Sequence, residues 1–143
     1  MPDRAFARLV PELICSDIER SLRFYVDVLG FTVLYARTEE RFAYLDYEGA
    51  QLMLEQSTGR RFLVGALEQP FGRGMNLQIE VSDVMLVYER VRRSNAGVLI
   101  PMEEKWYRAD DLELGNRQFV VQDPDGYLLR FFKDLGSRPV VKT

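Results

Sequence analysis

Side chains suited to holding an organic molecule recur in strand-like stretches of this chain. Met53 and Glu55 alternate with leucines in LMLEQ, and Asn76, Gln78 and Glu80 alternate with apolar residues in NLQIE. Carboxylates hold positive charge, and the aromatic rings that occur in neighbouring stretches stack on planar groups and attract cations at about 0.5–2 kcal/mol each. These residue types favour a planar, cationic or amide-rich ligand.

The alternation of strands predicts which side chains line one common face. The residues assigned to the opposite, helix-covered face are Leu52, Leu54, Leu77, Ile79, Val81 and Leu129. The predicted ligand-binding residues are Glu12, Phe42, Tyr44, Met53, Glu55, Asn76, Gln78, Trp106, Tyr107, Phe119, Arg130 and Phe132. Of these, Trp106 and Tyr107 come from residues 103–115, a charged stretch that we expect to be a loop at the mouth of the site.

Other roles for the same residues remain open at this point. The phenylalanines could fill the middle of a closed barrel, because aromatic side chains are mostly found in cores. Glu55 could be a solvated strand end, and Arg130 could be a structural partner of Glu55 or Asp46. Trp106 and Tyr107 could belong to a dimer interface, where both residue types are enriched.

The chain has no histidine and only one cysteine, Cys15. Zinc, copper and non-haem iron sites therefore lose their usual ligands, and Ser-His or Cys-His nucleophilic pairs cannot be built. Only a carboxylate site for a hard cation remains possible. We expect no metal, no cofactor and no catalytic residue, and we expect Cys15 to be a core thiol.

Composition narrows the class of partner. The 143 residues are 47% apolar, enough for one core or for two small modules, and 19 basic residues against 22 acidic ones give a net charge of −3. No basic field is present to attract nucleic acid or an anionic membrane. The start, MPDRAFARL, lacks the apolar run of a signal peptide, and no stretch approaches the roughly 20 apolar residues of a membrane span. We expect a cytoplasmic protein.

The first half predicts one strand, one helix and three further strands. The strand covers residues 8–15, and Pro11 places it at an edge, at a bend or at a crossing between subunits. Residues 16–19 have capping-box spacing, and the apolar stripe that follows ends at Gly30. The three strands cover residues 31–36, 42–47 and 51–55.

The second half repeats this plan after a connection at residues 56–74. A strand at 76–81 precedes a helix that begins after Asp83 and ends at Gly97; a strand at 98–102, the loop at 103–115 and a hairpin at 117–133 follow. If Pro124 faces Tyr127 across a two-residue loop, the hairpin register places Gln122 opposite Leu129, Val121 opposite Arg130 and Phe119 opposite Phe132. The repeats are offset by 66 residues at the first strand and by 77 at the last, which indicates an internal duplication.

Two such halves, with VPELICSDIERSLRFYVDVLGF in the first and DPDGYLLRF in the second, resemble the glyoxalase/bleomycin-resistance/extradiol-dioxygenase (vicinal oxygen chelate) superfamily. The resemblance implies an α+β fold in which two βαβββ modules form a curled mixed-sheet cleft. We expect one domain over residues 1–143, with module one at about 6–56, a connection at about 57–74 and module two at about 75–135. Its metal-using members would place ligands at Val10, Met53 (or Glu55), Asn76 and Arg130.

The details VPxL, LMLE and DPDGxLLR resemble the metal-free bleomycin-resistance branch. This resemblance implies a homodimer that binds a cationic glycopeptide antibiotic without altering it and exchanges its N-terminal strand, with Pro11 at the hinge. We therefore expect a stoichiometric small-molecule binder. One alternative is a glyoxalase-like or dioxygenase-like metalloenzyme with an atypical site, and another is a scaffold or sensor whose cleft is closed.

Overall fold

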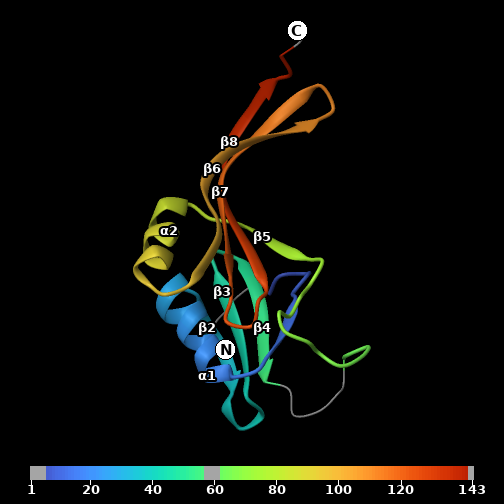
Figure 1. Ribbon diagram of the computed structural model, residues 1–143, viewed down its shortest axis with the longest axis vertical. Helices are drawn as coiled ribbons and strands as arrows, with labels where there is room; N and C mark the ends of the chain where they lie inside the picture. Colours follow the sequence, from blue (N-terminus) through green and yellow to red (C-terminus); the bar gives the residue numbers. More distant parts are fainter. Residues whose placement is uncertain (1–5, 57–61, 142–143) are drawn as a thin grey trace. The chain divides into compact units, whose positions relative to one another are not determined.

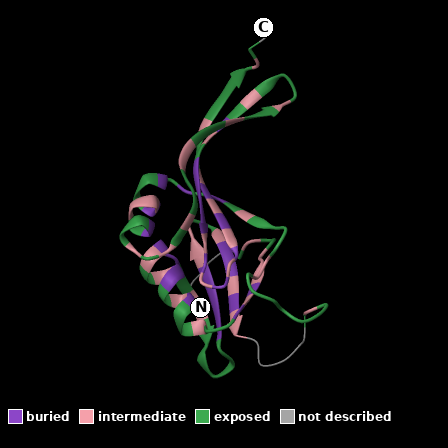
Figure 2. Ribbon diagram, viewed as in Figure 1, coloured by how far each residue is buried: buried purple, intermediate pink, exposed green. Residues whose placement is uncertain are grey.

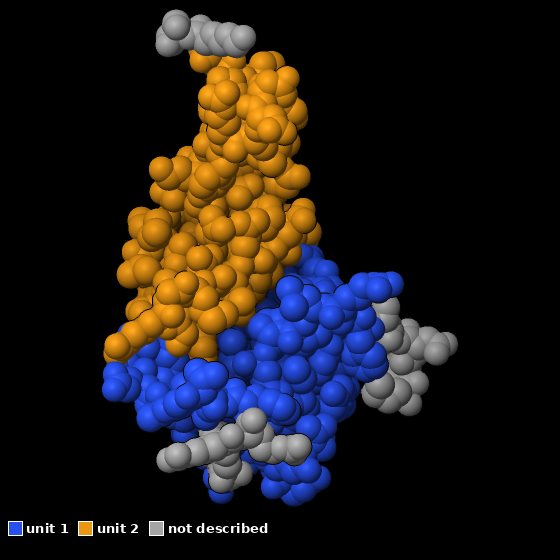
Figure 3. Space-filling model, turned by 90° about the vertical axis from the view of Figure 1, so that its right-hand side faces the viewer, with its two compact units in different colours: residues 1–71 blue, residues 72–143 orange. Residues whose placement is uncertain are grey.

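A computed structural model describes residues 6–56 and 62–141 of the chain. The chain divides into two compact units, residues 1–71 (unit 1) and residues 72–143 (unit 2), which Figure 3 shows in different colours. The expected connection lies partly at residues 57–61, outside the described residues. Its described part, residues 62–74, forms neither helix nor strand.

Unit 1 contains a four-stranded sheet, a helical segment formed by α1 and η1, and the short 3-10 helix η2 (Figure 1). Its elements are β1 (Glu12–Cys15), α1 (Ile18–Leu22), η1 (Arg23–Leu29), β2 (Thr32–Arg37), η2 (Thr38–Glu40), β3 (Phe42–Tyr47) and β4 (Ala50–Gln56). The strand order is β1-β4-β3-β2, in which β1 runs parallel to β4 and the other neighbours are antiparallel.

The helical segment of unit 1 begins and ends close to its predicted bounds. The Asp17 carboxylate, not Ser16, caps it by accepting hydrogen bonds from the backbone N–H groups of Glu19 and Arg20. Gly30 ends it at φ 96°, a left-handed conformation that glycine adopts without strain. The last seven residues, η1, form a π-helix continuous with α1.

Unit 2 repeats the arrangement with longer strands. Its elements are β5 (Asn76–Glu80), α2 (Val84–Arg93), β6 (Gly97–Ala109), β7 (Leu112–Gln122) and β8 (Leu128–Pro139). The strand order is β5-β8-β7-β6, and β5 runs parallel to β8. The prediction that Gly97 ends the helix is wrong: the helix ends at Arg93, the hydroxyl of the next residue, Ser94, donates to the Val91 carbonyl, and Gly97 already begins β6.

The duplication predicted from the sequence is confirmed at the level of strand register. Glu12 lies opposite Met53 in the parallel pair of unit 1, and Gln78 lies opposite Arg130 in the parallel pair of unit 2. These two pairs are related by the predicted offsets of 66 and 77 residues. The α+β fold of two βαβββ modules is therefore the observed one.

Each sheet buries the face that its own helix covers. In unit 1 the buried row includes Leu13, Leu45 and Leu54, and Cys15 belongs to it with 3% exposure, as expected of a core thiol. In unit 2 the buried row includes Leu129 and Phe131. Figure 2 shows the buried stretches of both sheets in purple. We call the other side of each sheet its open face.

The register of the β7–β8 hairpin differs by one residue from the prediction. Gln122 lies opposite Leu128, Val121 opposite Leu129 and Phe119 opposite Phe131. The connection has three residues, 124–126, because the Asp123 N–H donates to the Tyr127 carbonyl at 2.8 Å and the Gly126 N–H donates to the Asp123 carbonyl. Since a shift of one residue moves every side chain of a strand to the other face, Phe119 changes sides.

The prediction of a loop at residues 103–115 is also wrong. Residues 103–109 of β6 pair with residues 112–118 of β7, and the hairpin turns at Asp110, whose φ is 58°. Strand β8 continues alongside as far as Pro139. We call this three-stranded extension (residues 103–118 and 132–139) the arm; it continues beyond the part of the unit 2 sheet that α2 covers (Figure 1). Successive residues of each strand point to opposite sides, so both sides of the arm carry long charged side chains.

Along the described ranges, no helix combines the length and apolar character required to cross a membrane.

Candidate ligand-binding site

The open face of unit 1 brings together five of the predicted residues. Strand register places Tyr44 beside Met53 and Phe42 beside Glu55, while Glu12 flanks Met53 from β1. Antiparallel and parallel partners point to the same side of a sheet. This part of the predicted lining is therefore assembled as the alternation of β1, β3 and β4 indicated; that it binds a ligand stays a prediction.

Phe42 and Tyr44 are buried, with 3% and 5% exposure, and a third, half-buried ring, Tyr35 of β2, extends this aromatic group. Its ring stacks on Tyr44 with centroids 5.1 Å apart and an interplanar angle of 16°, and lies 5.9 Å from the ring of Phe42. The guanidinium of Arg37 sits 4.0 Å above the Phe42 ring. The sequence prediction missed Tyr35, because a register irregularity between Val33 and Tyr35 interrupts the alternation of β2. We call Tyr35, Phe42 and Tyr44 the ring cluster.

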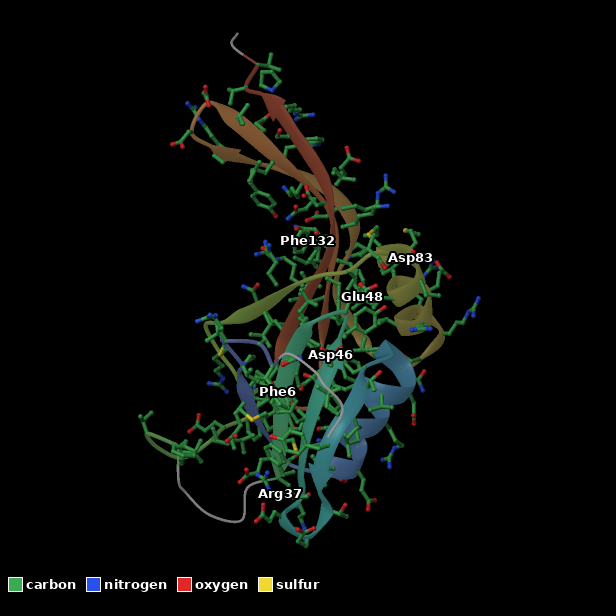
Figure 4. All side chains as sticks on the ribbon, turned by 180° about the vertical axis from the view of Figure 1, so that it is seen from behind. Phe6, Arg37, Asp46, Glu48, Asp83 and Phe132 are labelled. Atoms are coloured by element: carbon green, nitrogen blue, oxygen red, sulfur yellow. The ribbon has the colours of Figure 1, made fainter. Side chains whose placement is uncertain are left out.

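The N-terminal segment lies over this ring cluster. The Phe6 ring meets Tyr44 edge-on at 5.3 Å and Tyr35 at 6.3 Å. The next residue is tied down as well, since the Ala7 N–H donates to the Gln51 side-chain carbonyl at 2.7 Å and the Tyr44 hydroxyl donates to the same oxygen at 2.6 Å. Phe6 is labelled in Figure 4, against the sheet of unit 1.

The carboxylates of this face influence one another. Partial burial raises the pKa of Glu12 above its ordinary value, the negative charge of Glu55 raises it further, and the positive charge of Arg37 partly offsets both effects. Burial likewise raises the pKa of Tyr44, with smaller contributions from Tyr35 and Asp46. The face therefore favours a positive group that would stabilise the ionised Glu12.

The open face of unit 2 contains a cavity of about 590 Å³. This volume lies within the range of small-molecule sites, roughly 300–1,000 Å³. The residues that line it are Gln78, Glu80, Tyr107, Leu114, Asn116, Arg130, Phe132, Asp134, Gly136 and Ser137. Gln78, Tyr107, Arg130 and Phe132 are among the predicted binding residues, whereas the predicted Asn76 is not part of this lining. Phe132, labelled in Figure 4, lies on β8.

Five lining residues of this cavity escaped the prediction because they belong to the arm. Leu114 and Asn116 come from β7, and Asp134, Gly136 and Ser137 come from β8. Leu114 falls in the predicted loop, Asn116 lies between that loop and the predicted hairpin, and the three residues of β8 lie beyond the hairpin. The alternation of LELGNRQ in residues 112–118 is the signal that could have identified a strand there.

Polar side chains of unit 2 form two small groups. The Gln118 amide group donates to the Tyr107 hydroxyl oxygen at 2.6 Å and to the Glu103 carboxylate at 3.3 Å. The Arg130 guanidinium donates through Nη2 to the side-chain carbonyl of Gln78. The Nε–H of Arg130 is buried and has no hydrogen-bond partner among the described residues.

Trp106 does not line the cavity with Tyr107. The two residues are neighbours in β6, and neighbouring strand residues point to opposite faces. The indole packs on Gly115, and the guanidinium of Arg138 lies 3.9 Å from its ring centroid. The loop expectation placed both residues at one mouth, and the strand separates them.

Phe119 is not a ligand-facing residue. Its side chain is fully buried on the helix-covered face, where it packs against Tyr88 of α2 at 4.9 Å and stacks on Phe131 at 5.6 Å. The prediction for Phe119 is wrong because it rested on a two-residue hairpin loop where the chain has three.

A second cavity, of about 520 Å³, lies beside the start of α1 in unit 1. Its lining includes Asp17, Arg41 and Phe42, and no site was predicted here; of the three, only Phe42 is a predicted binding residue. The first helical N–H, that of Ile18, already donates to the Gln56 side chain at 3.0 Å. This part of the helix start is therefore satisfied by the protein itself.

The four positions implied for a metal do not provide a suitable donor set. Val10 and Met53 offer no oxygen or nitrogen ligand, Asn76 offers one amide oxygen, and Arg130 carries a fixed positive charge that repels a dication. Among the described residues, no group of three or more aspartate, glutamate or cysteine side chains is arranged to hold an ion. Glu55, the alternative to Met53, lies beside Phe42 in the ring cluster.

Comparison with known proteins agrees with this architecture. The family model "Glyoxalase/Bleomycin resistance protein/Dioxygenase superfamily" matches residues 6–131. A bleomycin resistance protein of Geobacillus stearothermophilus is 27% identical over 139 residues, covering 90% of this chain and 97% of the relative. A lactoylglutathione lyase of Haemophilus influenzae is 30% identical over 129 residues, covering 85% and 88%.

Among solved structures, TioX from Micromonospora sp. ML1 is similar at a TM-score of 0.65 and 27% identity, with 90% of this chain and all of that chain covered. The likeness therefore spans both units rather than one module.

Proposed function

The chain belongs to the glyoxalase/bleomycin resistance protein/dioxygenase superfamily, and from this we propose that it is a metal-free protein that binds a small molecule stoichiometrically, most concretely an antibiotic of the bleomycin type. Holding the ligand is then the whole mechanism. Affinity comes from ring stacking and charge pairing, with no transition state to stabilise. The proposal includes a cytoplasmic homodimer in which Pro11 is the hinge for exchange of the N-terminal strand.

The observation that carries the proposal is the combination of rings and acids on the open face of unit 1. The rings of Tyr35, Phe42 and Tyr44 form one contiguous cluster, in which Phe42 and Tyr44 are buried beneath Arg37 and Phe6, and the carboxylates of Glu12 and Glu55 lie beside it. A planar cation gains from both at once. The 27% identity to a bleomycin resistance protein over nearly the whole chain supports the drug class.

Direct titration tests this proposal. Phleomycin or bleomycin added to the purified protein should raise its melting temperature and release heat that saturates at one ligand per site. Glu55→Gln should weaken binding by about 5- to 10-fold, because an ion pair beside a ring is worth about 1–1.4 kcal/mol here. Glu39→Gln, an exposed glutamate of η2, is the matched control.

Two outcomes would count against the drug assignment. If the melting temperature and the heat signal stay unchanged at saturating drug, the chain does not sequester this class of antibiotic. If the recovered drug has a new mass, the protein is an enzyme and not a binder.

The second candidate is a lyase, favoured by the 30% identity to a lactoylglutathione lyase. It requires a metal, and the residues at Val10, Met53, Asn76 and Arg130 do not fit one. Elemental analysis that found a stoichiometric transition metal in the purified protein, together with turnover of a hemithioacetal, would favour this candidate over the binder.

The dimer has its own test. Substitution of Pro11 by alanine should shift the monomer–dimer equilibrium measured by sedimentation while leaving the circular dichroism spectrum unchanged, since proline at a hinge restricts the angle at which the strand leaves. An unchanged equilibrium would remove strand exchange from the proposal.

A further inference from the structure

The cavity of unit 2 differs chemically from the open face of unit 1 at equivalent positions. Gln78 and Arg130 occupy the positions that Glu12 and Met53 occupy in unit 1. An amide and a guanidinium thus replace a carboxylate and a thioether. The two modules offer different groups to whatever they bind.

The hydrogen-bond donors of Arg130 are only partly paired in the structure. A guanidinium has five N–H donors in a planar fork. Nη2 donates to the Gln78 carbonyl, while the Nε–H is buried and has no partner among the described residues. Buried N–H groups without an acceptor are rare in native structures, because the group gives up water and gains nothing in return.

The other charged groups of the lining are better hydrated. Glu80 and Asp134 are exposed, whereas Arg130 is only partly exposed. Solvated carboxylates at a rim are screened by water and salt, and a partly buried cation is screened less. The part of the cavity around Arg130 therefore favours a ligand group that accepts hydrogen bonds over one that donates them.

The remaining walls suit a flat ring. Phe132 and Tyr107 provide aromatic surface, and Leu114 adds an aliphatic side chain. The Tyr107 oxygen already accepts a hydrogen bond from Gln118, so its own O–H proton is available to a ligand. Both features favour a planar molecule with an oxygen acceptor at one end.

We propose that the unit 2 cavity binds a ring-bearing molecule through an oxygen acceptor, a carboxylate or a carboxamide, which Arg130 grips with Nε and Nη2 together. The acceptor takes the place of the Gln78 carbonyl and satisfies the orphan Nε–H. Gln78 then turns its own amide N–H groups toward the ligand. The inference rests on the proposed function only in that a small molecule is bound; the drug class does not enter it.

Three probes with the same ring separate the possible chemistries: 2-naphthoate, 2-naphthamide and 2-naphthylmethylamine. We expect the first two to bind and to shift the Nε–H resonance of Arg130 in ¹⁵N-resolved spectra of the full chain. The carboxylate is charged and has two acceptor oxygens, whereas the amide is neutral and has one acceptor oxygen, so their relative affinity reports how far charge and a second acceptor add to a single hydrogen-bond acceptor. Binding of the amine alone at this resonance, or no shift with any probe up to solubility, overturns the proposal.

Variants test the role of the guanidinium fork. Arg130→Gln should weaken 2-naphthoate at least tenfold, and Arg130→Lys, which keeps the charge but lacks Nε–H, should weaken the naphthamide as strongly as Arg130→Gln does. Gln78→Glu supplies an internal carboxylate that occupies the fork, so it should abolish binding of both probes and raise the melting temperature. The Gln78→Glu variant still tests the proposal if a change at Arg130 prevents folding. Unchanged affinity in Gln78→Glu contradicts the proposal.

The outcome is independent of the drug titration. Arg130-dependent naphthoate binding without any response to phleomycin would remove the drug assignment and leave the cavity assignment standing. Binding of phleomycin without any shift of the Arg130 resonance by the probes would remove the cavity assignment and leave the drug assignment standing.

Discussion

Gly115 lies directly beneath the indole of Trp106 in the arm of unit 2. A β-carbon built on Gly115 would be 2.6 Å from the ring atoms of Trp106, closer than real side chains approach. The guanidinium of Arg138 lies 3.9 Å from the ring centroid. The arm is thus fixed internally by one glycine, one indole and one cation, in a region without a covering helix.

The first prediction concerns that contact. Gly115→Ala should destabilise the protein by about 1–3 kcal/mol, because an added methyl group forces a well-packed ring to move. Thermal unfolding followed by the fluorescence of the single tryptophan measures it. Gly97→Ala is the matched control: its nearest neighbour is the Gln122 side chain at 3.8 Å, so its effect should stay within about 0.5 kcal/mol. Equal effects of the two changes would contradict the packing described.

A second prediction uses the pKa of Glu12, which burial and Glu55 raise above 4.5 in the folded protein. Between that ordinary value and the raised one, the folded chain holds more protons than the unfolded chain, so the free energy of unfolding falls as pH rises through this window. Glu12→Gln should remove that part of the pH dependence and raise the melting temperature at pH 7. The exposed control Glu39→Gln should leave the change in the free energy of unfolding between pH 4.5 and pH 7 as it is in the wild type.

A third prediction follows from the corrected hairpin register. Phe119→Ala should cost about 3–5 kcal/mol, because the side chain is fully buried between Tyr88 and Phe131. Phe132→Ala, on the open face, should cost about 1–2 kcal/mol and mainly weaken ligand binding. Chemical denaturation gives the first quantity and titration with 2-naphthamide the second. The reverse ranking would restore the register predicted from the sequence.

The Phe119 error shows where sequence reasoning about this fold was limited. Period-two alternation was enough for most strands, and capping residues with an apolar stripe were enough for the two helices, because each signal is local and occurs twice. The length of the hairpin loop could not be predicted in this way, since DPDG is compatible with two or three connecting residues. The three-residue loop is fixed by the Asp123 carboxylate, which accepts hydrogen bonds from the N–H groups of Asp125 and Tyr127.

The residues of the site could be predicted only where they lie on strands with regular alternation. Glu12, Tyr44 and Met53 follow from regular strands and share a face as expected. The arm residues were missed because charge density in residues 103–115 was taken as a sign of a loop, whereas a ribbon exposed on both sides also carries charge on both faces. The role of Phe6 depends on long-range packing, which no local pattern shows.

The fourth prediction concerns Phe6, which lies edge-on to Tyr44 and Tyr35 at the place where a flat cation would stack. Because Phe6 is 44% exposed, Phe6→Ala should cost no more than about 1.5 kcal/mol of stability, the upper value for such a ring pair. The change uncovers the ring cluster, so 2-naphthylmethylamine should bind more tightly than to the wild type, and Glu55→Gln should cancel that gain. Titration calorimetry measures both effects. Leu9→Ala, in the same segment and 86% exposed, removes apolar surface without touching the rings and should leave the affinity unchanged. If Phe6→Ala instead binds the amine less tightly, Phe6 is a wall of the site and not its occupant.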